Sequence, residues 1–237
     1  SSMVTKHVIT ALAAGPEKWS AVGLGTDVFV FNGGFLATWH AGVGDPVRAL
    51  GFMTDGREVL AASVVDDVTV LTACQTSAEV SPPTREVARV PGRSPVLAAS
   101  RDDQGRFALV VEREGAPVVL LGRADEPGGG LSTLDRAGAV HAAGPVGVTF
   151  VHGRGLVATV GPSELNLWRS DTGAHVRTLP YDAHRPRSVD ASPDGRWLAV
   201  GCDDGDVHLW PVSDDLVPAR TTPAPREVPG QVIPDLV

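Results

Sequence analysis

The stretch from residue 187 to residue 212, RSVDASPDGRWLAVGCDDGDVHLWPV, constrains the fold of this chain more than any other. Residues 192–195, Ser-Pro-Asp-Gly, predict a tight turn, because Pro presets φ at about −65° and Gly accepts positive φ. The apolar run 197–202 and the alternating run 207–210 have strand length, and an Asp-Gly step lies between them. We therefore predict three β-strands here, one before the turn at 192–195 and two after it. One such unit cannot bury its own apolar faces, so we expect copies elsewhere.

A glycine marks the corresponding turn in each of five units: Gly15, Gly56, Gly105, Gly155 and Gly195. These glycines are 41, 49, 50 and 40 residues apart, close to the roughly 40–45 residues of one four-stranded repeat. The predicted units cover residues 4–44, 45–92, 93–138, 139–183 and 184–217. No segment has a clear helical pattern, so we predict an all-β protein.

Two of these units resemble the blades of the WD-repeat β-propeller family. Residues 192–195 are similar to its Ser-Pro-Asp-Gly turn, and residues 165–168 and 209–210 are similar to its closing Leu-Trp. The resemblance is clearest over residues 139–217 and weaker over 4–138. It implies a propeller of about five four-stranded blades, in which Trp168, Gly195, Asp204 and Trp210 have structural roles.

In that family a buried His, a Ser or Thr, an Asp and a Trp form a hydrogen-bonded network within each blade. Asp204, Trp210 and His184 match three of these positions in the last unit. Val200 and Cys202 stand near the place of the hydroxyl residue. The resemblance therefore implies an incomplete network in this blade.

The number of units leaves the closure of the propeller undecided. The family resemblance implies seven blades more often than five, and an open sheet edge is an aggregation hazard. A closed five-bladed ring, an open arc completed by another chain, and a piece of a longer propeller all fit. Residues 218–237 are a Pro-rich tail and a candidate outer strand, and residues 1–3 are interpreted as a remnant of cloning.

The composition indicates a folded chain with an acidic balance: 43% of residues are hydrophobic, 20% are charged, and the formal net charge is −8. This charge argues against a general nucleic-acid binder. No apolar run approaches the about 20 residues of a membrane-spanning helix, so we predict no membrane association. Cys74 and Cys202 fall in different units, and we interpret them as reduced core thiols, in line with a cytoplasmic location.

Motifs for catalysis or cofactor binding do not appear in the sequence. The seven histidines lack the spacing of a zinc motif, and residues 203–206 lack the ligand spacing of a calcium loop. The glycines at 128–130 have no following Lys-Ser or Lys-Thr, as a phosphate-binding loop requires. Asp190 is one carboxylate on an otherwise apolar strand, whereas glycoside hydrolysis needs two. We therefore expect no metal, no cofactor and no catalytic residue.

Charged turns are predicted to gather on one face of the propeller, which the turns between second and third strands share with the connections between blades. This face is mainly acidic, with a basic sector near the last unit, and would favour a basic peptide or protein. A solvated face that binds nothing explains the same charges. The candidate partner-binding residues are Trp39, His40, Asp66, Asp67, Arg93, Glu164, His184, Arg185, Arg187, Asp203 and Asp204.

The sequence thus favours a non-catalytic protein-interaction scaffold, a domain or partner of a larger bacterial assembly, by analogy with the fold. The expected partner is a protein or peptide. Self-association, or a second chain that completes the propeller, stays open. A small propeller enzyme or ligand-binding protein that acts through the central channel is the alternative.

Overall fold

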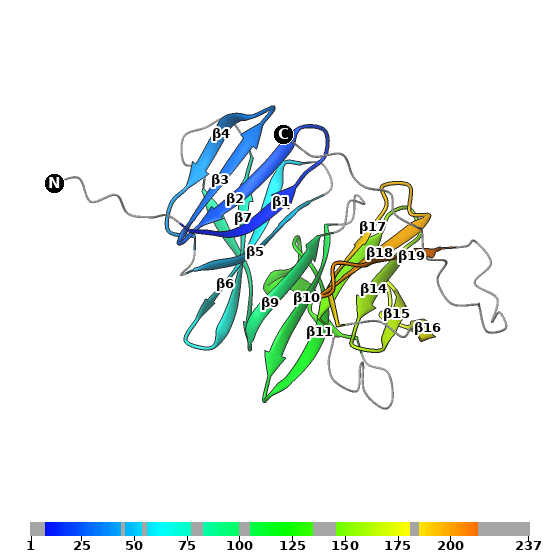
Figure 1. Cartoon of the computed structure of the whole chain (residues 1–237). Helices are drawn as coiled ribbons and strands as arrows, with labels where there is room; N and C mark the ends of the chain where they lie inside the picture. The colour runs from blue at the N-terminus through cyan, green and yellow to red at the C-terminus, as the bar shows by residue number, and fades with distance from the viewer. Residues whose placement is uncertain are drawn as a thin grey trace.

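The computed structural model describes residues 8–43, 46–53, 56–76, 83–99, 105–134, 146–180 and 185–212. Within these ranges the chain forms nineteen β-strands and one short 3-10 helix, and no α-helix. The strands make five antiparallel sheets of consecutive strands, which we number as blades 1 to 5 (Figure 1). The predicted all-β propeller of about five blades is confirmed. Blade 5 has three strands within the described residues, and each of the others has four.

The blades follow one another in chain order. Blade 1 contains β1(Ile9–Ala14), β2(Trp19–Leu24), β3(Asp27–Asn32) and β4(Phe35–His40). Blade 2 contains β5(Val47–Phe52), β6(Glu58–Val65), β7(Val68–Gln75) and β8(Thr84–Pro91). Blade 3 contains β9(Arg93–Ala99), β10(Arg106–Arg113), β11(Ala116–Arg123) and, after the 3-10 helix η1(Pro127–Gly130), β12(Ser132–Thr133). Blade 4 contains β13(Gly147–Val151), β14(Leu156–Val160), β15(Glu164–Arg169) and β16(His175–Pro180), and blade 5 contains β17(Pro186–Ala191), β18(Trp197–Cys202) and β19(Val207–Pro211).

The Ser-Pro-Asp-Gly turn joins β17 to β18 as its sequence requires. Gly195 has φ of 65°, and its amide donates a hydrogen bond to the Ser192 carbonyl over 2.9 Å. The Ser192 hydroxyl donates to Asp194 over 2.6 Å and accepts from the Trp197 amide over 3.0 Å. A Cβ on Gly195 would also collide with the backbone oxygen of His152 in blade 4, so this position needs glycine twice over.

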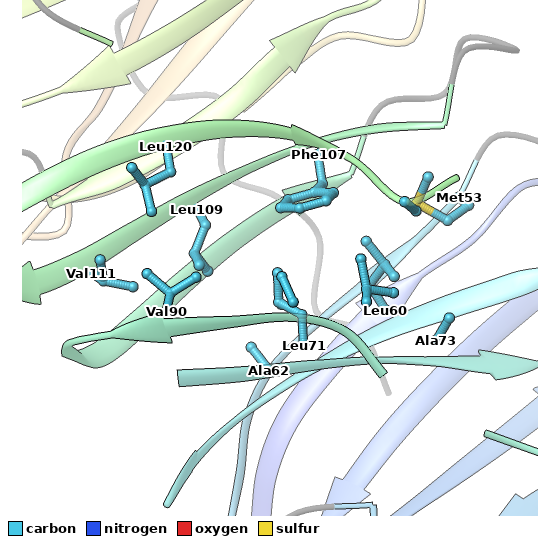
Figure 2. Packing of buried hydrophobic residues seen from close by; sticks show 13 residues of the cluster. Met53, Leu60, Ala62, Leu71, Ala73, Val90, Phe107, Leu109, Val111 and Leu120 are labelled. Atoms are coloured by element: carbon cyan, nitrogen blue, oxygen red, sulfur yellow. The ribbon is translucent and has the colours of Figure 1, made fainter. Parts of the chain in front are cut away.

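The core lies between blades, in four apolar clusters. The largest joins blades 2 and 3, where Leu60 and Leu71 face Phe107 and Leu109 (Figure 2). The other three clusters join blades 1 and 2, blades 3 and 4, and blades 4 and 5. Each interior blade therefore buries both faces of its sheet, which explains the nearly unbroken apolar runs of β6 and β10.

The glycine run at 128–130 belongs to this packing. By composition, residues 127–130 are typical of a flexible, linker-like loop. Instead, η1 packs on β8, and Gly129 is buried. A Cβ on Gly129 would lie 3.1 Å from the Ala88 Cβ and 3.2 Å from Phe107 Cζ, so glycine allows blade 3 to approach blade 2 closely.

The first strands of the blades pack against one another in the order β1, β5, β9, β13 and β17. Within the described residues, β17 does not pack against β1 to a comparable extent. Blades 1 and 5 accordingly keep exposed apolar side chains on one face each. The described strands form an arc of five blades with an uncovered face at either end (Figure 1).

Candidate functional site

Turns from several blades gather at one end of the propeller, which we call the rim. Because consecutive strands are antiparallel, the turn between second and third strands lies at the same end as the connection into the next blade. Backbone hydrogen bonds tie these segments together: the Val47 amide donates to the Gly25 carbonyl and the Gly92 amide donates to the Asp67 carbonyl, both over 2.8 Å. The rim therefore has a fixed backbone on which side chains are presented.

A cleft opens in the rim between blades 2 and 3. Its volume is about 480 Å³, within the range of peptide and small-molecule pockets. The turn from β6 to β7 forms one wall, and the turn from β10 to β11 forms the other. The charged residues that line it are Asp67, Arg93, Glu112, Arg113 and Glu114.

Gly92 shapes the floor of this cleft. Its φ is 133°, and a Cβ there would lie 2.7 Å from the Glu112 carbonyl oxygen. Its own carbonyl accepts a hydrogen bond from the Thr69 hydroxyl over 2.8 Å. Only glycine lets the chain leave blade 2 so close to blade 3. This role was not predicted from the sequence, although the Pro-Gly step is a usable turn signal.

The charges of the cleft are unequal. Arg93 NH2 lies 2.6 Å from Asp67 Oδ2, and both side chains are exposed, so this ion pair adds little stability. The remaining charged side chains are two carboxylates, Glu112 and Glu114, and one guanidinium, Arg113. The cleft is thus net negative.

A second charged group lies on the rim at blade 5. Arg187 binds both carboxylate oxygens of Asp203, with NH2 2.7 Å from Oδ2. Hydrogen bonding and the nearby positive charge of Arg187 lower the pKa of the Asp203 carboxyl and raise the pKa of Arg187 itself. The Arg185 carbonyl accepts from the Asp203 amide over 3.1 Å. Asp204 is exposed and accepts from the Asp206 amide over 3.1 Å, so it caps a turn rather than entering a buried network.

Trp39 and His40 lie at the end of β4 with opposite orientations, as neighbours in a strand must. The Trp39 ring stacks on Phe29, with centroids 5.9 Å apart, and its Nε1 donates to Asp27 Oδ2 over 3.2 Å. His40 is only 1% exposed, and its Nε2 lies 2.8 Å from the Gln75 carbonyl oxygen. The prediction that His40 contacts a partner is therefore corrected, because this buried side chain binds a backbone carbonyl of blade 2 instead.

The other predicted rim residues are more scattered. Asp66 is exposed in its turn with φ of 48°, and Glu164 accepts a hydrogen bond from Asn166 Nδ2 over 3.2 Å. His184 lies outside the described residues. The structure thus brings the predicted residues together in two groups, Asp67 with Arg93 in the cleft, and Arg185, Arg187, Asp203 and Asp204 at blade 5.

Blade 4 contains a buried tryptophan–hydroxyl pair. Trp168 is fully buried, and its Nε1 donates to Thr159 Oγ1 over 2.9 Å. Trp210 is buried in the matching place of blade 5, where Val200 replaces the threonine. Val200 was placed correctly from the sequence, whereas the role of Thr159 was not predicted. The threonine could have been found by aligning the second strands of the two units.

Possible metal ligands are dispersed in the described part of the chain. It contains no group of three or more His, Cys, Asp or Glu side chains placed to hold a metal ion. Asp190 accepts hydrogen bonds from the Thr149 hydroxyl over 3.3 Å and from the Ala191 amide over 2.8 Å. No helix there has the length and apolar character to cross a membrane.

The fold defines the class of protein: a five-bladed, all-β propeller with a charged rim. A protein-family model agrees with this fold for part of the chain, since residues 173–211 match the model of the WD domain, G-beta repeat. This match runs from β16 of blade 4 through the three strands of blade 5. The family model therefore matches one repeat of the chain, and the fold as a whole is that of a β-propeller.

Two solved structures are similar to it in fold. One is the β-propeller domain of Cps50 (Swd1) from Myceliophteria thermophila, with 15% identity and a TM-score of 0.64 over 83% of this chain. The other is Sqt1 from Saccharomyces cerevisiae, with 16% identity and a TM-score of 0.62 over 86% of this chain. The alignments cover 63% and 59% of those two chains, so this chain spans less than two thirds of either. No curated protein matches the sequence.

Proposed function

We propose that this chain is a non-catalytic protein-interaction scaffold that binds an extended, basic segment of a partner protein in the rim cleft between blades 2 and 3. The cleft itself carries the proposal, because it combines a pocket-sized volume with a fixed backbone and a net negative lining. A preformed site of this kind loses little conformational entropy when it binds a ligand.

The charge of the lining selects the chemistry of the partner. Glu112 and Glu114 would accept hydrogen bonds from a Lys or Arg side chain, and the acidic net charge of the whole chain would speed encounter with a basic partner. The Arg187–Asp203 pair would add a second, polar contact for a longer segment. WD-repeat propellers generally bind proteins or peptides, and the match of residues 173–211 to that repeat supports the proposal.

An arrayed library of octapeptides, with Lys or Arg moved through the sequence, provides the probes, and fluorescence anisotropy measures the affinity of the best peptide. The double variant Glu112→Lys/Glu114→Lys should raise its Kd at least about tenfold. The matched control Asp125→Lys/Asp171→Lys makes the same change of net charge at the opposite end of blades 3 and 4. Equal effects of both variants, or no basic peptide that binds, would refute the proposal.

We also propose a bacterial source and a cytoplasmic location. Only two of the twenty basic residues are Lys, which fits a GC-rich genome. Cys74 and Cys202 are free thiols, as a reducing compartment favours. Burial raises the pKa of Cys74 to about 12, so that thiol is unreactive in the folded protein.

A further inference from the structure

The outward face of blade 1 is apolar across the whole sheet. Register places Leu12 opposite Val22, Val22 opposite Phe29, and Phe29 opposite Trp39, so one row of apolar side chains crosses all four strands. Leu12 on the first strand of blade 1 is 67% exposed, whereas apolar residues such as Leu50 and Phe150 on the first strands of interior blades are buried. The stacking on Phe29 and the bond to Asp27 hold the Trp39 ring in place, as a binding anchor requires.

The outward face of blade 5 is its counterpart at the other end of the arc (Figure 1). Register places Ala199 opposite Leu209, and Trp197 opposite Pro211. On the first strand of the blade, the exposed Asp190 lies opposite Ala199, so this face is apolar on β18 and β19 and carries one carboxylate on β17. Trp197 is 47% exposed and Leu209 is 37% exposed. Among the described residues, no strand packs on either end face, so the two faces do not cover each other.

These two faces are the two halves of one blade interface. In each interior interface, the face of one blade that is turned toward the next blade packs on the facing side of that next blade. Between blades 4 and 5, for example, Leu165 and Leu167 cluster with Leu198 and Trp210. In the described part of the chain, the outward faces of blade 5 and blade 1 have no neighbouring blade packed on them, so the series could continue from one molecule into another.

We propose that the chain associates with a second copy of itself head to tail, with the outward face of blade 5 in one copy packed on the outward face of blade 1 in the other. This contact would be of the same kind as the four interior interfaces, in which the apolar faces of neighbouring blades pack on each other. A heterologous contact of this kind generates either a closed ring of copies or an open chain of them.

The size of the faces sets the strength of this contact. The four six-residue strands of blade 1 span about 19 Å by 20 Å, which is roughly 400 Å² of flat area, and the three described strands of blade 5 offer less. Stable interfaces bury about 800 Å² per partner, so this one lies at the low end even after side-chain relief is counted. We therefore expect association that depends on concentration in the micromolar range.

Sedimentation velocity of the purified chain at roughly 1–300 µM tests the proposal, with two single variants that each block one face. Leu12→Lys blocks blade 1 and Leu209→Lys blocks blade 5. Each alone should stay at the monomer mass of 24.6 kDa, because a buried charge raises the Kd by at least about 30-fold. Their equimolar mixture should restore one contact and give a dimer but nothing larger.

Val65→Lys is the matched control, since Val65 is an exposed apolar residue on neither end face, and this variant should associate like the parent chain. Near-ultraviolet circular dichroism checks that each variant folds. A parent chain that stays monomeric at every concentration would overturn the proposal. So would a Leu209→Lys variant that still dimerises while Leu12→Lys does not, because blade 1 would then pair with itself.

Discussion

The tryptophan–hydroxyl bond of blade 4 can be tested by replacing Thr159 with valine. This change keeps the shape of the side chain and removes only the oxygen that accepts from Trp168 Nε1 over 2.9 Å. Trp168 is fully buried, so its N–H group would lose its acceptor away from water. A buried donor without a partner costs about 1–3 kcal/mol. In a chain of this size, each kcal/mol corresponds to roughly 2–4 °C in Tm.

Urea unfolding of Thr159→Val, Trp168→Phe and the double variant forms a complete thermodynamic cycle. We expect a coupling energy of about 1 kcal/mol between the two side chains, the usual net value of one hydrogen bond. Thr133→Val makes the same chemical change at an exposed strand position and should change stability by less than about 0.5 kcal/mol.

A local measurement separates the hydrogen bond from a general loss of packing. Hydrogen exchange of the Trp168 indole N–H should be slow in the parent chain and faster in Thr159→Val. Stability of Thr159→Val within about 0.5 kcal/mol of the parent, together with unchanged indole exchange, would show that this hydroxyl is not the acceptor.

Three further outcomes are expected from the same structure. Trp210→Ala should cost about 3–5 kcal/mol in urea unfolding, because it empties a buried aromatic site, whereas the exposed Asp66→Ala should cost less than about 0.5 kcal/mol. Arg187→Gln should raise the pKa of Asp203 toward the ordinary value of about 3.9 in a carbon-detected NMR titration. Since that pKa is lowered by folding, the pair's contribution is complete above the ordinary value and disappears as the pH falls through the folded one. Iodoacetamide at pH 8 should modify Cys74 only after the chain unfolds, since the thiol is buried with a pKa of about 12.

The sequence predicted the blades well because their signals are local. The Ser-Pro-Asp-Gly turn at 192–195 and the apolar runs around it depend on neighbouring residues alone, and the structure has a turn and two strands there. The burial of Trp168 and Trp210 followed from the same pattern. Residues 218–237 and the predicted outer strand among them lie outside the described residues.

The site was harder to predict because it depends on contacts between blades. His40 ends a strand beside an exposed tryptophan, and only the neighbouring carbonyl of Gln75 explains its burial. Glycine is required at position 92 because a Cβ there would lie 2.7 Å from a backbone oxygen of blade 3. A contact between blades of this kind cannot be predicted from the neighbouring residues alone. Whether the second apolar face of an end blade is covered likewise depends on closure, which repeat spacing does not determine.

The two proposed surfaces differ in the physics of their contacts, and this difference allows them to be separated in one preparation. The rim cleft binds through charges that are exposed to solvent, such as Glu112 and Glu114, and salt screens such charges within about 10 Å at 0.1 M. The end faces associate through apolar rows such as the one that contains Leu12 and Phe29, which salt does not screen. Raising the ionic strength should therefore weaken peptide binding and leave the copies associated. If both activities fell together with added salt, one charged surface would have to account for both, and the apolar faces would have no role in association.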